Sequence, residues 1–204
     1  MATKIAPASA ELKDYYSARS GWRHGGEERM RFSKAAKLAR VRSGAVVLDI
    51  GARDGGLRKY LPRDIRYQGM DIAPEFESEH VLIRDIALGI PFEDERFDNV
   101  FMIEVLEHVH NPWGALTEIR RVLKPGGVFT VSVPNPYHFK ELVWNLLEID
   151  DRQGHIFAWT RQAMTALAKM NGFRLEATGG TYLHPPIPMV TLLARSIVYR
   201  FVKE

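Results

Sequence analysis

The chain has 204 residues, the length of one domain, with 46% hydrophobic and 26% charged residues, as in an ordinary globular protein. This composition excludes a disordered, collagen-like or coiled-coil protein, and the absence of cysteine excludes disulfides, thiolate nucleophiles and cysteine-ligated metal sites. The net charge of +3 is uneven: residues 1–45 carry ten Lys/Arg against four Asp/Glu, and the rest carries a net −3. We interpret the basic start as a solvated helix face in preference to a surface for an anionic partner.

Residues 1–26 have no regular period, whereas apolar residues recur at helical spacing over 27–41 and predict a helix. Strand and helix patterns then alternate. Strands are expected at 45–50, 66–71, 80–83, 97–103, 128–133 and 173–177. Helices are expected at 57–61, 112–123, 137–147 and 160–170, with Thr160 as an N-cap and 124–127 ending the second of them. The tail from 187 to 202 suits a helix, and 197–203 also suits a final edge strand; we favour a short helix followed by a strand.

This alternation predicts an α/β, Rossmann-like, doubly wound fold, with a mostly parallel seven-stranded sheet and helices on both faces. Ligands of such sheets bind beyond the carboxyl ends of the strands. No apolar run reaches the roughly 18 residues of a membrane span, and the N-terminus lacks the pattern of a secretory signal, so we expect a cytoplasmic protein.

Polar residues follow four successive strands. The first strand leads into a glycine turn, 51–56, which lets the backbone turn sharply but lacks the spacing of a dinucleotide site. Asp71 follows the second strand, about twenty residues after the turn, where a carboxylate can accept from a ribose diol. Asp85 and Ile86 follow the third strand and could bind an exocyclic amine and flank a flat ring. Glu104 to His108 follow the fourth strand.

The blocks VLDIGARDGG (47–56), MDIAPE (70–75), RDIALGIPFEDERFDNVFMIEVLEHV (84–109), RRVLKPGGVFTVSVPN (120–135) and HIFAWTRQAMTALAKMNGF (155–173) resemble class I S-adenosylmethionine-dependent methyltransferases of the small-molecule "type 11" group. The resemblance implies S-adenosylmethionine as cofactor, a methyltransferase domain at 45–204 and a lid at 1–44. It also implies cofactor contacts, from the methionine end to the adenine, by Asp49, Gly51, Ala52, Arg53, Gly55, Glu104, Asp71, Ile72, Asp85 and Ile86.

One residue departs from the family pattern, because Arg53 stands where the second glycine of D-x-G-x-G-x-G is usual. We expect Arg53 to keep an ordinary backbone conformation and point away, so that cofactor binding is retained. The alternatives are a weakened site and a catalytically inactive binding protein.

Candidates for a base near the transferred methyl are His108, Glu107 and His155, and Tyr15, Tyr16, Trp22 and His24 could belong to the lid. Because His108 and His155 are available as bases, we favour methylation of an oxygen on a small molecule, lipid or glycan precursor. E-x-x-E-H from Glu104 to His108, with His155, is also similar to the metal site of small-RNA 3′-end 2′-O-methyltransferases, which leaves a metal-dependent RNA enzyme as an alternative. The favoured interpretation has no metal and no nucleic-acid partner.

The remaining expectations concern partners. A nicotinamide oxidoreductase is disfavoured by the glycine spacing. We expect a monomer or homodimer. The C-terminal tail, with Arg195 and Arg200 beside apolar residues, could make a peripheral membrane contact, although a buried amphipathic element is favoured.

Overall fold

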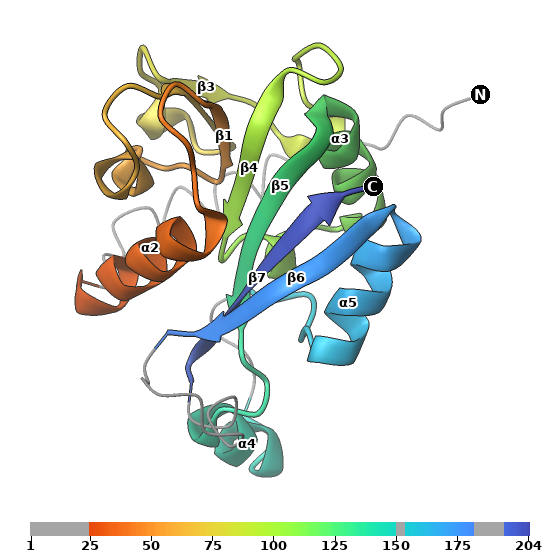
Figure 1. Ribbon diagram of the computed structural model, residues 1–204. Coiled ribbons are helices and arrows are strands. Elements are labelled where there is room, and N and C mark those ends of the chain that lie inside the picture. Colours follow the sequence, from red (N-terminus) through yellow and green to blue (C-terminus); the bar gives the residue numbers. More distant parts are fainter. Residues whose placement is uncertain (1–24, 150–153, 182–193) are drawn as a thin grey trace.

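The computed structural model describes residues 25–149, 154–181 and 194–204. Its centre is one seven-stranded sheet in the order β3-β2-β1-β4-β5-β7-β6 (Figure 1). The first five strands of that order run parallel, and β7 pairs antiparallel with both β5 and β6. The strands are β1 (Val46–Ile50), β2 (Arg66–Asp71), β3 (Val81–Ile83), β4 (Phe97–Ile103), β5 (Leu123–Pro134), β6 (Phe173–Gly180) and β7 (Ser196–Lys203). The predicted fold class is confirmed.

Successive residues of a strand point to opposite faces of the sheet, and here both are apolar. Helices therefore cover both faces. On one face, Val47 and Phe101 pack with Ala35 and Ala39 of α2. On the other, their neighbours Leu48 and Val100 belong to the core that also holds residues of α3 and α5. The α-helices are α2 (Gly25–Ala39), α3 (Pro112–Val122), α4 (Phe139–Leu146) and α5 (Arg161–Met170). Short 3-10 turns are η1 (Gly56–Tyr60), η2 (Pro74–Phe76), η3 (Ile86–Leu88) and η4 (Leu106–His108).

Several element boundaries follow the predicted signals. Thr160 caps α5, with its Oγ1 accepting from Ala163 N at 3.1 Å. The segment predicted as a helix at 57–61 is instead the tighter turn η1. β5 begins at Leu123, five residues earlier than predicted, because Leu123 already pairs with Phe97 before the register shifts. In the tail, 196–203 forms the predicted strand, whereas 187–193 lies outside the described residues.

The strand at the C-terminus occupies an interior position, so the expectation of an edge strand at 197–203 is wrong. β7 lies between β5 and β6, and its first four residues are buried. Arg200 is partly buried and ion-paired with Glu176. Within the part of the chain that the structure describes, none of the helices combines the length and apolarity needed to cross a bilayer.

Candidate active site

The glycine turn follows the carboxyl end of β1 and is hydrogen-bonded to the carboxyl end of β2. Gly51 N and Ala52 N donate to Met70 O at 2.7 and 3.2 Å. Gly51 has φ +75°, and a Cβ there would lie 2.2 Å from Val105 Cγ2, so both the backbone and the packing require glycine. The turn therefore packs directly against the segment that follows β4.

Arg53 does not have the ordinary backbone conformation that we expected. Its φ is 50°, the left-handed region that glycine normally occupies. The reason is tertiary: in this conformation Arg53 N donates to Asp71 Oδ2 at 2.8 Å. The guanidinium lies over the ring of Phe76, with Cζ 5.5 Å from its centroid. The turn thus keeps the shape that a glycine would give it.

Asp49 lies beneath this turn as a buried carboxyl. It is 3% exposed, and Tyr67 donates its hydroxyl to Asp49 Oδ2 at 2.7 Å. Burial, with a smaller contribution from the charge of Asp71, raises the pKa of Asp49 to about 7, although the Tyr67 hydrogen bond opposes this. Asp49 therefore links β1 to Tyr67 of β2 inside the fold.

Asp71 ends β2, and backbone N–H groups orient its carboxylate. Oδ2 accepts from Arg53 N, and Oδ1 accepts from Ala73 N at 3.0 Å. Burial raises the pKa of Asp71, and the backbone hydrogen bonds partly offset that rise. A carboxylate offers about four acceptor positions, so capacity remains for ribose hydroxyls.

The adenine side of the predicted site lies one strand further along. Asp85 is 8% exposed and caps η3 by accepting from Ala87 N at 2.9 Å. Ile86 is partly buried against the main core, and Ile72 is partly buried after β2. Two acids and two apolar side chains thus follow β2 and β3, whose carboxyl ends are neighbours at one sheet edge, and they fit a purine nucleoside.

Glu104, after β4, is tied to elements that the sequence did not connect with it. Its φ is 55°, and its Oε2 lies 3.2 Å from Arg31 Nη1 on α2. The hydroxyls of Ser132 and Ser196 donate to the same carboxylate at 2.8 and 3.1 Å. Arg31 was missed in the sequence. The available signal is its spacing, because Arg31, Ala35 and Ala39 recur every four residues and share one helix face.

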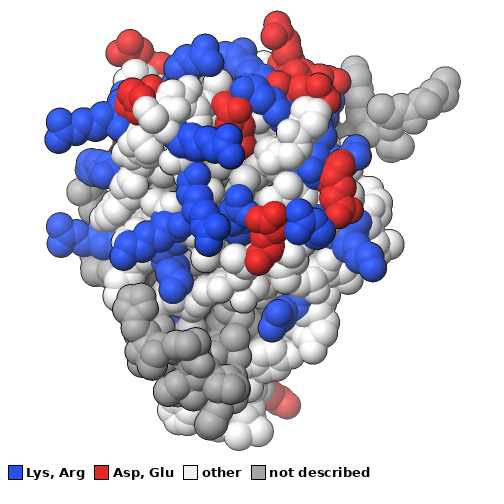
Figure 2. All heavy atoms as spheres, viewed as in Figure 1, with Lys and Arg blue, Asp and Glu red and all other residues white. Residues whose placement is uncertain are grey.

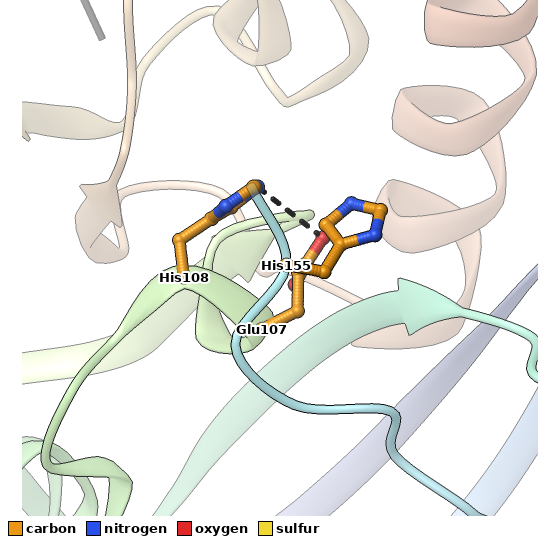
Figure 3. Close-up of side chains that lie close together, drawn as sticks. All are labelled: Glu107, His108 and His155. Carbon is orange, nitrogen blue, oxygen red and sulfur yellow. Dashed lines mark ion pairs between the residues drawn. The ribbon is translucent and has the colours of Figure 1, made fainter. Parts of the chain in front are cut away.

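The three predicted catalytic residues come together (Figure 3). Glu107 and His108 lie in η4, and His155 comes from the segment before α5. One ligand atom from each lies within 4.8 Å of the other two. The imidazole rings of His108 and His155 are 5.0 Å apart between centroids. Glu104 is not a member of this group.

Glu107 is 1% exposed, and in the part of the chain that the structure describes neither of its carboxyl oxygens has a hydrogen-bond partner. Burial, reinforced by the charge of Glu104 and opposed by Arg31, raises the pKa of Glu107 well above its usual range. The predicted lid residues Tyr15, Tyr16, Trp22 and His24 lie outside the described residues.

Comparison with known proteins gives concordant results. A family model described as a methyltransferase domain matches residues 22–178. The chain is 30% identical over 159 residues to 2-methyl-6-phytyl-1,4-hydroquinone methyltransferase of Synechocystis sp., covering 67% of this chain and 46% of that protein. It is 33% identical over 107 residues to demethylmenaquinone methyltransferase of Tropheryma whipplei, covering 48% and 45%. The chain thus spans about half the length of these curated relatives.

Solved structures share the fold at low identity. A Thermotoga maritima protein, described as an S-adenosylmethionine-dependent methyltransferase and possible histamine N-methyltransferase, matches with TM-score 0.68 and 18% identity over 95% of this chain and 97% of that one. The [4+2]-cyclase SpnF matches with TM-score 0.67 and 17% identity over 98% and 97%. The fold alone therefore does not specify the reaction.

Proposed function

Because the chain belongs to the class I S-adenosylmethionine-dependent methyltransferases, with S-adenosylmethionine as its cofactor, we propose that it methylates an oxygen atom of a small lipid-like or glycan-precursor acceptor. The cofactor supplies an electrophilic methyl group on a sulfonium. The chain must then bind it, place the acceptor in line and remove the acceptor's proton.

The observation that carries the proposal is which nitrogen of the His108 ring carries the proton. His108 Nδ1 lies 3.0 Å from Gly154 O, and a carbonyl oxygen can only accept, so Nδ1 carries the proton. In this tautomer Nε2 is the nitrogen that carries the lone pair and can take a proton from an acceptor hydroxyl. As Nε2 takes the hydroxyl proton, the acceptor oxygen forms its bond to the methyl carbon. The carbon–sulfur bond breaks, and its electron pair stays on the sulfur as a neutral thioether.

Support for an apolar acceptor comes from the exposed surface near the carboxyl ends of the parallel strands. α4 follows the carboxyl end of β5 (Figure 1), and its Phe139 and Leu146 are 72% and 83% exposed. Ile156 and Phe157, next to His155, are 44% and 37% exposed. The named relatives act on a phytylated hydroquinone and a demethylated menaquinone. An acceptor with a hydrocarbon portion matches both observations.

The test uses S-adenosylmethionine with a deuterated methyl group and the full chain. The offered acceptors are an isoprenoid hydroquinone, simple phenols and alcohols, and a total lipid extract. Mass spectrometry and NMR of the product should place the label on oxygen as a methyl ether. Label on carbon or nitrogen would refute the choice of oxygen. Binding of S-adenosylhomocysteine, measured by calorimetry in the same preparation, tests the cofactor independently.

An RNA acceptor is the second candidate, and surface charge is the observation that favours it. Lys and Arg gather on the face that carries α2 and β6 (Figure 2), and Arg29 and Lys37 of α2 and Arg40, which follows the helix, are exposed. A defined RNA oligonucleotide, offered as acceptor at several salt concentrations, tests this. Salt-sensitive methylation of its 3′-terminal ribose would replace the small-molecule proposal. We expect none, because Arg31 of the same helix is turned inward onto Glu104.

A further inference from the structure

The cluster of Glu107, His108 and His155 contains a buried carboxyl group that has no hydrogen-bond partner among the described residues. A buried carboxylate normally accepts several hydrogen bonds, because losing water without replacement costs several kcal/mol. Within residues 25–149, 154–181 and 194–204, no group donates to either oxygen of Glu107, although the residue is 1% exposed. Its Oε1 lies 3.9 Å from His108 Nε2, too far for a hydrogen bond. Figure 3 shows both imidazole rings beside this carboxylate.

The backbone holds the cluster together. Ile156 N and Phe157 N both donate to Glu107 O, at 2.8 and 3.2 Å. Gly154 O accepts from His108 Nδ1, so it also fixes the orientation of that ring. These three bonds fasten the segment that carries His155 to η4. An imidazole whose other nitrogen donates to a carbonyl is the usual arrangement of a metal-ligating histidine.

Glu104 does not contribute to the cluster, and this affects which ion would fit. Its carboxylate is occupied by Arg31, Ser132 and Ser196. What remains is two imidazoles and one carboxylate. This ligand set suits first-row transition ions such as Zn²⁺, Fe²⁺, Co²⁺ and Mn²⁺, whereas Mg²⁺ prefers oxygen ligands and water.

We propose that Glu107, His108 and His155 bind one divalent transition-metal ion and leave coordination positions open toward the methyl acceptor. Two ligand atoms each about 2.1 Å from one ion lie about 3 to 4 Å apart, so a small closure of the three side chains completes the site. The inference rests on the proposed oxygen methylation and changes its proton acceptor. An ion held there would lower the pKa of an acceptor hydroxyl, whose proton would pass to water, and His108 would then be a ligand in place of the base.

The test starts from the full chain stripped with a chelator and dialysed. Zn²⁺, Co²⁺, Mn²⁺ and Mg²⁺ are titrated separately by calorimetry, and bound metal is counted by elemental mass spectrometry. We expect one equivalent of a transition ion and a visible Co²⁺ spectrum typical of nitrogen and oxygen ligands. Glu107→Gln, His108→Gln and His155→Gln should each weaken binding by about 100-fold or more, because even outer-shell losses cost 10–100-fold. His110→Gln, an exposed neighbour, is the matched control and should leave binding unchanged.

Three binding results would overturn the metal site, in addition to the activity result given below. They are no binding of any transition ion, binding that survives Glu107→Gln and His155→Gln, or a preference for Mg²⁺. Circular dichroism of each variant checks that it is folded. S-adenosylhomocysteine binding and the position of the deuterated methyl group are read in the same samples. Chelator-insensitive formation of a methyl ether would refute the metal and keep the proposed function, whereas a metal-loaded protein that labels carbon would refute oxygen methylation alone.

Discussion

Asp71 and Glu107 are both buried carboxyl groups near the carboxyl ends of parallel strands of one sheet, β2 and β4, which flank β1, yet their surroundings differ. Each oxygen of Asp71 accepts a backbone N–H, from Arg53 and Ala73. Neither oxygen of Glu107 accepts a hydrogen bond from any residue that the structure describes. The cofactor side of the site is thus oriented before any ligand arrives, whereas the acceptor side holds a carboxylate that still needs a proton or a cation. This division suits a reaction in which one partner is constant and the other is deprotonated.

The first way to test this comparison is to remove the acceptor-side imidazole. His108→Ala should lower methyl transfer by about 10²- to 10⁴-fold, whether the ring is a base or a ligand, because proton removal from the acceptor depends on it. Calorimetry with S-adenosylhomocysteine should give an unchanged affinity, since the cofactor side is held separately. His110→Ala serves as control. Equal loss of transfer and of cofactor affinity would show that the two sides are not separable.

A second prediction concerns Asp49, a buried carboxyl that, unlike Glu107, has a hydrogen-bond donor. Because burial raises its pKa from 3.8 to about 7, the folded protein favours the protonated form. Its contribution to stability is therefore fully present below about pH 4 and is lost as the pH rises toward 7. Relative to Asp49→Asn, the wild type should lose about 1.4 kcal/mol of unfolding free energy per pH unit over that window, about 4 kcal/mol in all.

The measurement is urea unfolding of wild type and Asp49→Asn at several pH values between 4 and 8. Asparagine keeps an acceptor for the Tyr67 hydroxyl but cannot ionise. Exposed Glu79→Gln is the control and should run parallel to the wild type. Parallel curves for wild type and Asp49→Asn would mean that Asp49 is ionised across the range and that Tyr67 donates to a charged group.

A third prediction addresses the cofactor side directly. Asp71→Ala removes the acceptor for ribose hydroxyls and for two backbone N–H groups. The affinity for S-adenosylhomocysteine should fall by about 10- to 100-fold, the value of one or two hydrogen bonds to a charged group. Asp71→Asn keeps one oxygen acceptor and should fall in between. An Asp71→Ala variant that binds with wild-type affinity would remove Asp71 from the ribose site.

The fold was predictable because its signals are local. Apolar strand cores, glycine turns and the Thr160 cap depend on residues close in sequence, and their order leaves few topologies open. Boundaries that depend on pairing were less accessible. β5 extends back to Leu123 because Phe97, twenty-six residues earlier, pairs with it.

The sequence predicted which residues lie at one edge of the sheet, but not the contacts between their side chains. Strand ends pointed to Asp71, Asp85, Glu107 and His108, since any parallel sheet brings such residues to one edge. The Arg31–Glu104 ion pair joins residues 73 positions apart, and it separates Glu104 from the other members of the alternative metal site. Side-chain direction of this kind depends on packing between α2, β5 and β7, which no local pattern encodes.

The smallest expected effect lies at Arg53, where the cofactor-side turn departs from the family. Arg53→Gly and Arg53→Ala both lose the contact with Phe76, worth about 0.5–1 kcal/mol, but only glycine relieves the left-handed backbone at φ 50°. Thermal or urea unfolding should therefore rank the glycine variant above the alanine variant by about 1–2 kcal/mol, with cofactor affinity retained in both. Equal stability would mean that the turn adopts another conformation in solution. A large gain in S-adenosylhomocysteine affinity on Arg53→Gly would instead show that the arginine obstructs the cofactor. The hydrogen bond from Arg53 N to Asp71 would then occupy an acceptor position that the ligand needs, instead of orienting the carboxylate for the ligand.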